Sequence, residues 1–267
     1  MSLLGIDIAW ATPGVPDIKS TGAQWVARYF SQDPTKDLTA GEVQQYTAAG
    51  LGIVTVFETS AGRALQGHQA GAIDASDAIA ERAAVGLPQD AVIYFAVDTD
   101  TTWASVQDYF DGVCTIIPKA QVGVYGGYQV AEGGHSYGLK YIWQTVAWSG
   151  GQWSTWATIK QTGGTVLSGG ADIDYAEVPD FGQYPRPEDD VTPQDKQDII
   201  NGVKALLQDP TLRGLAEADN LWWLSHALQG TVPNGATPSQ ASSIIAIHNE
   251  LQNLANKPVA PAVPPTA

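Results

Sequence analysis

The stretch AVIYFAVDTD, residues 91–100, joins an uninterrupted apolar run to two aspartates. The run Ala91–Val97 has the length and the apolar character of a short buried strand. The carboxylates Asp98 and Asp100 follow where that strand ends. Functional groups of α/β barrels gather at the C-terminal ends of the strands, so this stretch indicates both a fold class and the place of a site.

The same pattern repeats on either side of this stretch. Short apolar strands alternate with amphipathic helical segments through the first 180 or so residues, which is typical of a parallel α/β fold. Helices are expected at Ala40–Ala49, Gln66–Val85 and Thr102–Ile117, and the later connections are short and glycine-rich. Eight strands are expected, at Leu3–Ile8, Gln24–Tyr29, Gly52–Phe57, Ala91–Val97, Gln121–Tyr125, Tyr141–Thr145, Thr158–Gln161 and Ala171–Tyr175.

Eight strands in this length predict a (β/α)8 TIM-like barrel in which some helices are reduced. An open doubly wound sheet is the alternative, but no phosphate-binding glycine loop follows the first strand. The barrel is predicted over residues 1–183 and a proline-rich, charged linker over 184–191. A small all-α region is expected over 192–256, and a proline-rich disordered tail over 257–267.

Composition excludes several classes of function. The formal net charge of −15 argues against binding to nucleic acid or to an anionic membrane. The single cysteine, Cys114, offers no disulfide framework, and the four histidines show no metal-ligand spacing, so neither a metal nor a cofactor is expected. No signal peptide and no membrane-spanning segment are predicted.

Acidic residues recur at the ends of four predicted strands. Asp7 closes the first strand, Glu58 follows the third, Asp98 and Asp100 end the fourth, and Asp172 lies in the eighth together with Asp174. On a strand, Asp98 and Asp100 would point to the same face with Cα atoms about 6.5–7 Å apart. Repulsion within such a cluster raises at least one pKa and yields a proton donor near neutral pH, which glycosidic cleavage requires.

Aromatic residues are the second signal. Tryptophans crowd residues 143–156, and rings of this kind stack on the apolar faces of sugars. Tyr125, Gln161 and Trp143 are therefore candidate substrate-binding residues. Arg28 ends the second strand, where it either pairs with a site carboxylate and lowers its pKa or forms an ion pair inside the barrel.

Four motifs together resemble glycoside hydrolase family 25, and more narrowly the family-25-like domains of actinobacterial secreted proteins and phage lysins. They are Gly5-Ile6-Asp7, Phe95-Ala96-Val97-Asp98-Thr99-Asp100, Gly123-Val124-Tyr125-Gly126-Gly127-Tyr128 and Ala171-Asp172-Ile173-Asp174-Tyr175. The resemblance implies a muramidase-like barrel. It matches Asp7, Asp98 and Asp172 to family acids and puts Asp100 where the family has its general acid, a glutamate.

The resemblance implies a peptidoglycan glycosidase, and we expect a phage lysin or a virion-associated wall hydrolase that is made in the cytoplasm and delivered by a holin or by the particle. Asp100, with Glu58 as the alternative, would protonate the glycosidic oxygen. Asp98 would stabilise the positive charge or orient an acetamido group, while Asp7 and Asp172 tune the pKa values. The alternatives are a silent glycan-binding barrel and a structural phage component that associates with itself or with other phage proteins through 192–256.

Overall fold

A computed structural model describes residues 2–10 and 13–186 of the chain. The chain divides into two units, Met1–Asp189 and Asp190–Ala267, and all described residues belong to the first. Most of the predicted linker, the predicted helical region at 192–256 and the predicted tail at 257–267 lie outside the described residues.

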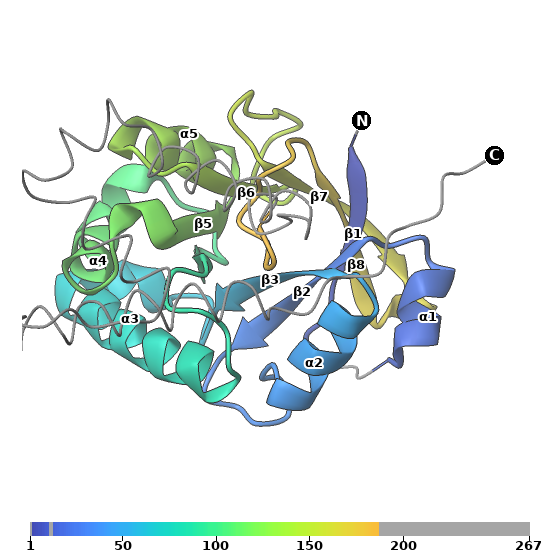
Figure 1. The fold of residues 1–267 in the computed structure, drawn as a ribbon. Helices are drawn as coiled ribbons and strands as arrows, with labels where there is room; N and C mark the ends of the chain where they lie inside the picture. Colours follow the sequence, from blue (N-terminus) through green and yellow to red (C-terminus); the bar gives the residue numbers. More distant parts are fainter. Residues whose placement is uncertain (1, 11–12, 187–267) are drawn as a thin grey trace, which may run out of the picture. The chain divides into compact units, whose positions relative to one another are not determined.

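The described residues form a closed eight-stranded barrel in which each strand pairs with its neighbours in chain order (Figure 1). This confirms the predicted TIM-like barrel. The strands are β1 (Leu3–Asp7), β2 (Trp25–Phe30), β3 (Gly52–Phe57), β4 (Ile93–Ala96), β5 (Val122–Gly126), β6 (Tyr141–Thr145), β7 (Ile159–Val166) and β8 (Ala171–Ala176).

Five α-helices follow the first five strands: α1 (Val15–Ser20), α2 (Ala40–Ala48), α3 (Gly67–Ala84), α4 (Trp103–Ile116) and α5 (Tyr128–Tyr137). Short 3₁₀ turns lie at Arg63–Gln66, Lys119–Gln121 and Leu167–Gly169. No α-helix of the described residues follows β6 or β7, so the reduced connections expected late in the barrel are present. None of the described helices combines the length and apolar character that crossing a bilayer requires.

The last strand departs from the parallel pattern. β1 to β7 pair in parallel, but β8 runs antiparallel to both β7 and β1. The 3₁₀ turn Leu167–Gly169 reverses the chain directly after β7, without a helix to return it to the other end of the barrel. The beginning of β8 therefore lies beside the end of β1.

Alternation along the strands separates two apolar layers. In β4, Tyr94 and Ala96 belong to the cluster that fills the barrel, with Trp25 and Trp143 as its largest members. Phe95 belongs to the second cluster, which packs the outer face of the strands against the helices. After β8 the chain stays on the barrel, because Tyr184 exchanges backbone hydrogen bonds with Ile53 of β3.

Two glycines bring α3 and α4 into backbone contact, and the two helices lie side by side in Figure 1. A Cβ atom on Gly112 would lie 2.0 Å from the carbonyl oxygen of His68, and one on Gly71 would lie 1.9 Å from that of Tyr109. Because α3 follows β3 and α4 follows β4, this contact fixes the helices next to the strands that carry Glu58 and Asp98.

We predict that Gly112→Ala destabilises the barrel by about 2 kcal/mol or more, since the overlap with backbone exceeds the gain of about 1 kcal/mol in helix propensity. Chemical denaturation would measure the change. Gly41→Ala is the control: Gly41 is a helical glycine of α2 with no atom outside its chain neighbours nearer than 3.9 Å to an added Cβ. Equal stabilities for the two variants would contradict the role given to this contact.

Candidate active site

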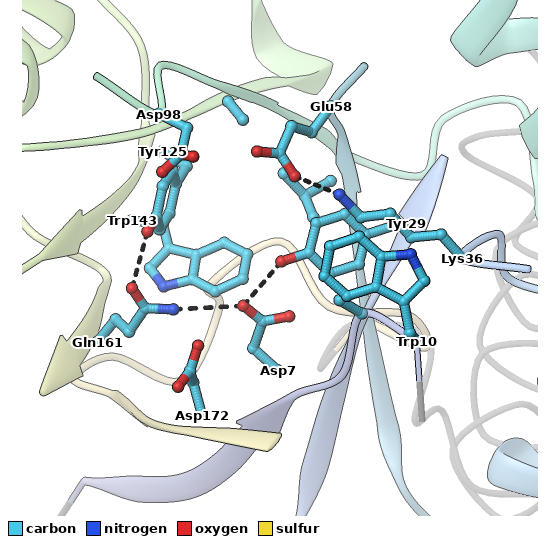
Figure 2. A pocket seen from close by; sticks show the side chains of 13 residues that line it. Asp7, Trp10, Tyr29, Lys36, Glu58, Asp98, Tyr125, Trp143, Gln161 and Asp172 are labelled. Carbon is cyan, nitrogen blue, oxygen red and sulfur yellow. Dashed lines mark hydrogen bonds and ion pairs between the residues drawn. The ribbon is translucent and has the colours of Figure 1, made fainter. Parts of the chain in front are cut away.

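A pocket of about 240 Å³ lies at the end of the barrel where β1 to β7 finish (Figure 2). Each of the eight strands, or the residues directly after it, contributes at least one side chain to its wall. The lining residues are Asp7, Ala9, Trp10, Tyr29, Lys36, Val56, Glu58, Ala96, Asp98, Tyr125, Trp143, Gln161 and Asp172.

The direction of β8 brings Asp172 into this pocket. In the β1–β8 ladder Asp7 is the partner of Asp172, and Gly5 is the partner of Asp174. Asp7 ends β1, whereas Asp172 lies at the beginning of β8. The sequence pattern predicts these acids at corresponding strand ends, and the structure brings Asp172 to the same rim by the opposite strand direction.

Asp7 is a buried carboxyl with incomplete hydrogen bonding. Its Oδ2 accepts from the Tyr29 hydroxyl at 3.0 Å and from the Gln161 amide at 3.2 Å, while its Oδ1 is buried without a partner among the described residues. Burial raises the pKa of Asp7 to about 7, and the charges of Asp172 and Glu58 add to the effect. Asp7 therefore exchanges a proton close to neutral pH.

Glu58 follows β3 and forms an ion pair with Lys36, which lies in the loop between β2 and α2. The Lys36 ammonium also lies over two aromatic rings, 3.9 Å from the ring centre of Tyr29 and 5.2 Å from that of Trp10. Such cation–π contacts hold a lysine in a partly dehydrated pocket. The ion pair fixes the position of the Glu58 side chain against Lys36.

Asp98 lies in the pocket wall on the other side of Glu58 from Lys36 (Figure 2). Burial raises the pKa of Asp98, and the charge of the neighbouring Glu58 raises it further. Of these two acids, Asp98 is therefore the one whose surroundings favour the protonated form.

The polar wall opposite this pair consists of three predicted binding residues. The Tyr125 hydroxyl donates to Gln161 at 2.7 Å, and Gln161 donates in turn to Asp7 (Figure 2). The Trp143 ring meets the Tyr125 ring edge-on, with centres 5.1 Å apart. These contacts fix Tyr125, Gln161 and Trp143 as one rigid wall of the pocket.

Arg28 does not face the pocket. Its guanidinium pairs with Glu42 of α2 at 3.0 Å and donates to the carbonyl oxygens of Ile8 and Ala9. Glu42 is itself held by a capping box with Thr39 at the start of α2. Arg28 therefore pairs with a helix residue and not with a pocket carboxylate, and it fixes the chain directly after Asp7.

Asp100 is exposed and does not line the pocket. β4 ends at Ala96, so the alternation of a strand no longer governs Asp98 and Asp100. The pocket thus contains Asp7, Glu58, Asp98 and Asp172 of the predicted acids, and lacks Asp100. The catalytic and binding roles of all these residues stay predictions.

Sequence reasoning missed Trp10, Tyr29 and Lys36. All three lie at the end of a strand or in the loop after it, where the site of a barrel is built, and that position was the signal for them. Trp10 is 67% exposed at the rim, where a flat apolar ring is available to a sugar. Among the described residues, no three His, Cys, Asp or Glu side chains gather so that they could hold a metal ion.

Comparison with solved structures gives the same barrel. The Tat-secreted protein Rv2525c of Mycobacterium tuberculosis, in complex with HEPES, is 25% identical with a TM-score of 0.64 over 67% of this chain and 98% of that one. An uncharacterized B. stearothermophilus protein is 13% identical, with a TM-score of 0.50 over 66% of this chain and 96% of that one.

A family 25 glycosyl hydrolase from Bacillus anthracis also matches, at 11% identity and a TM-score of 0.46 over 66% of this chain and 89% of that one. No curated protein matches the chain.

One family model matches residues 16–178, which is more than half of the chain. Its description, the Rv2525c-like glycoside hydrolase-like domain, agrees with the resemblance drawn from the motifs around Asp7, Asp98 and Asp172. The chain belongs to the Rv2525c-like glycoside hydrolase-like domain family.

Proposed function

We propose that this protein is a glycoside hydrolase that cleaves bacterial peptidoglycan, with Asp98 as the proton donor. The observation that carries the proposal is the neighbouring pair of pocket carboxyls Asp98 and Glu58, with Lys36 on the far side of Glu58 (Figure 2). Hydrolysis of a glycosidic bond needs a carboxylic acid that remains protonated near neutral pH beside a second, charged carboxylate. In the pocket Asp98, whose pKa is raised, lies beside Glu58, which is paired with Lys36.

In this mechanism Asp98 gives its proton to the glycosidic oxygen as the bond from that oxygen to the anomeric carbon breaks. Asp7 and Asp172, across the pocket, stabilise the positive charge that develops on the sugar. In the alternative mechanism, the acetamido oxygen of the substrate attacks the anomeric carbon, and Asp7 and Asp172 orient the acetamido group. A water molecule then adds to the anomeric carbon, and its proton returns to Asp98.

This assignment differs from the roles that the resemblance implied. Asp98 takes the place of Asp100 as the acid, because Asp100 is exposed outside the pocket. Glu58 becomes the residue that keeps the proton on Asp98. The choice of peptidoglycan as substrate is supported by the family-25-like motifs and by the family's description as glycoside hydrolase-like.

Glycan binding without turnover is the second candidate function. The exposed position of Asp100, where the resemblance expects the general acid, favours it. The aromatic side chains Trp10, Tyr125 and Trp143 would bind a glycan in either case. Turnover measured beside binding separates the two functions.

We extend the proposal to the protein's setting, as a phage lysin or a virion-associated wall hydrolase that reaches the wall through a holin or on the particle. Mass spectrometry of purified particles of the encoding phage would test the second route. Recovery of the chain in particles supports it, and recovery only in the lysate supports release at lysis.

We predict that Asp98→Asn reduces the release of reducing ends from purified peptidoglycan by about 100-fold or more, because an amide cannot donate the proton that general acid catalysis needs. Thermal unfolding would show that the variant stays folded. Asp100→Asn is the matched control and should keep most of the activity. The reverse result, loss in Asp100→Asn and activity in Asp98→Asn, would restore the assignment implied by the resemblance.

Lys36→Met should move the alkaline limb of the pH–activity profile to higher pH. The Lys36 charge lowers the pKa of both Asp98 and Asp7, so its removal lets both acids keep their protons to higher pH. Rates of peptidoglycan hydrolysis between about pH 4 and 10 would show the shift. Lys140→Met, which breaks a surface ion pair with Asp180, is the control and should leave the limb in place.

Asp7→Asn should stabilise the protein at pH 8 but not at pH 4. The pKa of Asp7 is higher in the folded chain, about 7, than its ordinary value of 3.8. Folded protein therefore binds the proton more tightly, and ionisation costs stability as the pH rises from about 4 to 7. The gain in the variant is on the order of 2–4 kcal/mol above pH 7. A difference in unfolding free energy that does not change with pH would contradict this.

A further inference from the structure

Asp174 is a buried acid that the proposed mechanism does not use. It is fully buried on β8, two residues from Asp172, so both side chains point into the barrel. Its Cα partners are Gly5 on one neighbouring strand and Gln161 on the other. Asp172 lines the pocket and Asp174 does not, which places Asp174 one layer deeper in the barrel.

The surroundings of Asp174 do not support a charge. Its Oδ1 accepts one hydrogen bond, from the Trp143 indole N–H at 2.8 Å. Its Oδ2 is buried without a partner, and none of the ion pairs between described residues includes Asp174. A buried carboxylate without a cation and with a single donor costs several kcal/mol, so the neutral acid is the stable form.

A second carboxyl close by strengthens this conclusion. Burial raises the pKa of Asp174 well above its ordinary value, and the charge of Asp7 raises it further. Asp7 has two donors on its Oδ2, from Tyr29 and Gln161, whereas Asp174 has one. Of the two buried acids, Asp7 is therefore the one that ionises.

Trp143 links Asp174 to the pocket. Its ring lines the pocket and packs edge-on against Tyr125, at 5.1 Å, and against Tyr94, at 5.7 Å between ring centres. The indole N–H has one acceptor, Asp174 Oδ1. Tyr125 continues the connection through Gln161 to Asp7. The acceptor that Asp174 supplies thus fixes the wall that holds Asp7 and a bound sugar.

We propose that Asp174 is held as a neutral carboxylic acid in the barrel interior and is a positioning residue for the site, acting through the Trp143 indole. Its neutral form leaves the negative charge of the pair to Asp7, next to the reacting sugar. The effect on catalysis rests on the proposed function, but the protonation state and the Trp143 contact do not.

Two substitutions in the full-length chain separate charge from hydrogen bonding. Asp174→Asn has the shape of the neutral acid and keeps the acceptor for Trp143. Asp174→Leu keeps the branched shape with bulkier methyl groups and removes the acceptor, which leaves the buried indole N–H unpaired. Carbon-13 NMR of the aspartate carboxyls and the nitrogen-15 resonance of the Trp143 indole report on both properties without any turnover.

In the wild type we expect the Asp174 carboxyl to keep the chemical shift of a neutral acid over the pH range in which Asp7 titrates, near 7. Asp174→Asn should leave the Asp7 midpoint and the Trp143 resonance close to their wild-type values. Asp174→Leu should move the Trp143 resonance and, if the protein turns over peptidoglycan, lower kcat/KM by about tenfold or more without the same loss in Asp174→Asn.

An ionised Asp174 at pH 7, or an Asp7 midpoint that falls by about one unit or more in Asp174→Asn, would overturn the neutral state, because removal of a real charge favours ionisation of Asp7. A Trp143 resonance that stays in place in Asp174→Leu would overturn the positioning role. If that variant does not fold, the wild-type titration and Asp174→Asn still decide the charge. Absence of turnover in all proteins bears on the proposed function alone.

Discussion

The closure of the barrel by an antiparallel strand is the constraint on which the rest of the site depends. Once β8 runs against β1, Asp172 must face Asp7, and Asp174 must enter the interior below them. Three carboxyl groups then share one end of an apolar barrel, where an unpaired charge is costly. Neighbouring polar side chains donate hydrogen bonds to two of these acids, Asp7 and Asp174.

The acids in this part of the barrel are stabilised more by protonation and by hydrogen-bond donors than by positively charged side chains. Lys36 is the cation that lines the pocket, and it pairs with Glu58. Asp7 receives the Tyr29 hydroxyl and the Gln161 amide. Asp7, Asp98, Asp172 and Asp174 all have raised pKa values, with burial as the largest cause for each. Buried acids of this kind lower the free energy of unfolding. Carboxyl groups with raised pKa values are typical of sites that transfer protons.

Most of the barrel could be predicted from apolar runs, because a strand buried on both faces has an uninterrupted pattern. The direction of β8 could not, since such a run is the same in either direction. α5 was missed because glycines disfavour a helix. Its Gly133 is required by packing instead, since a Cβ atom there would lie 2.0 Å from the Trp103 side chain. Lys36 and Tyr29 were missed because no spacing in the sequence relates them to Glu58 and Asp7; only the closed barrel does.

The position of Asp100 differs from the one that the sequence motif predicts. The spacing of Asp98 and Asp100 puts both on one face only if the strand continues, and β4 ends at Ala96. Past that point the chain turns toward α4, which begins at Trp103, and the second aspartate is carried out to solvent. The partner of Asp98 is then a residue of the adjacent strand's loop, Glu58. Because α3 and α4 are in backbone contact behind these two loops, the pair depends on tertiary packing that no short motif contains.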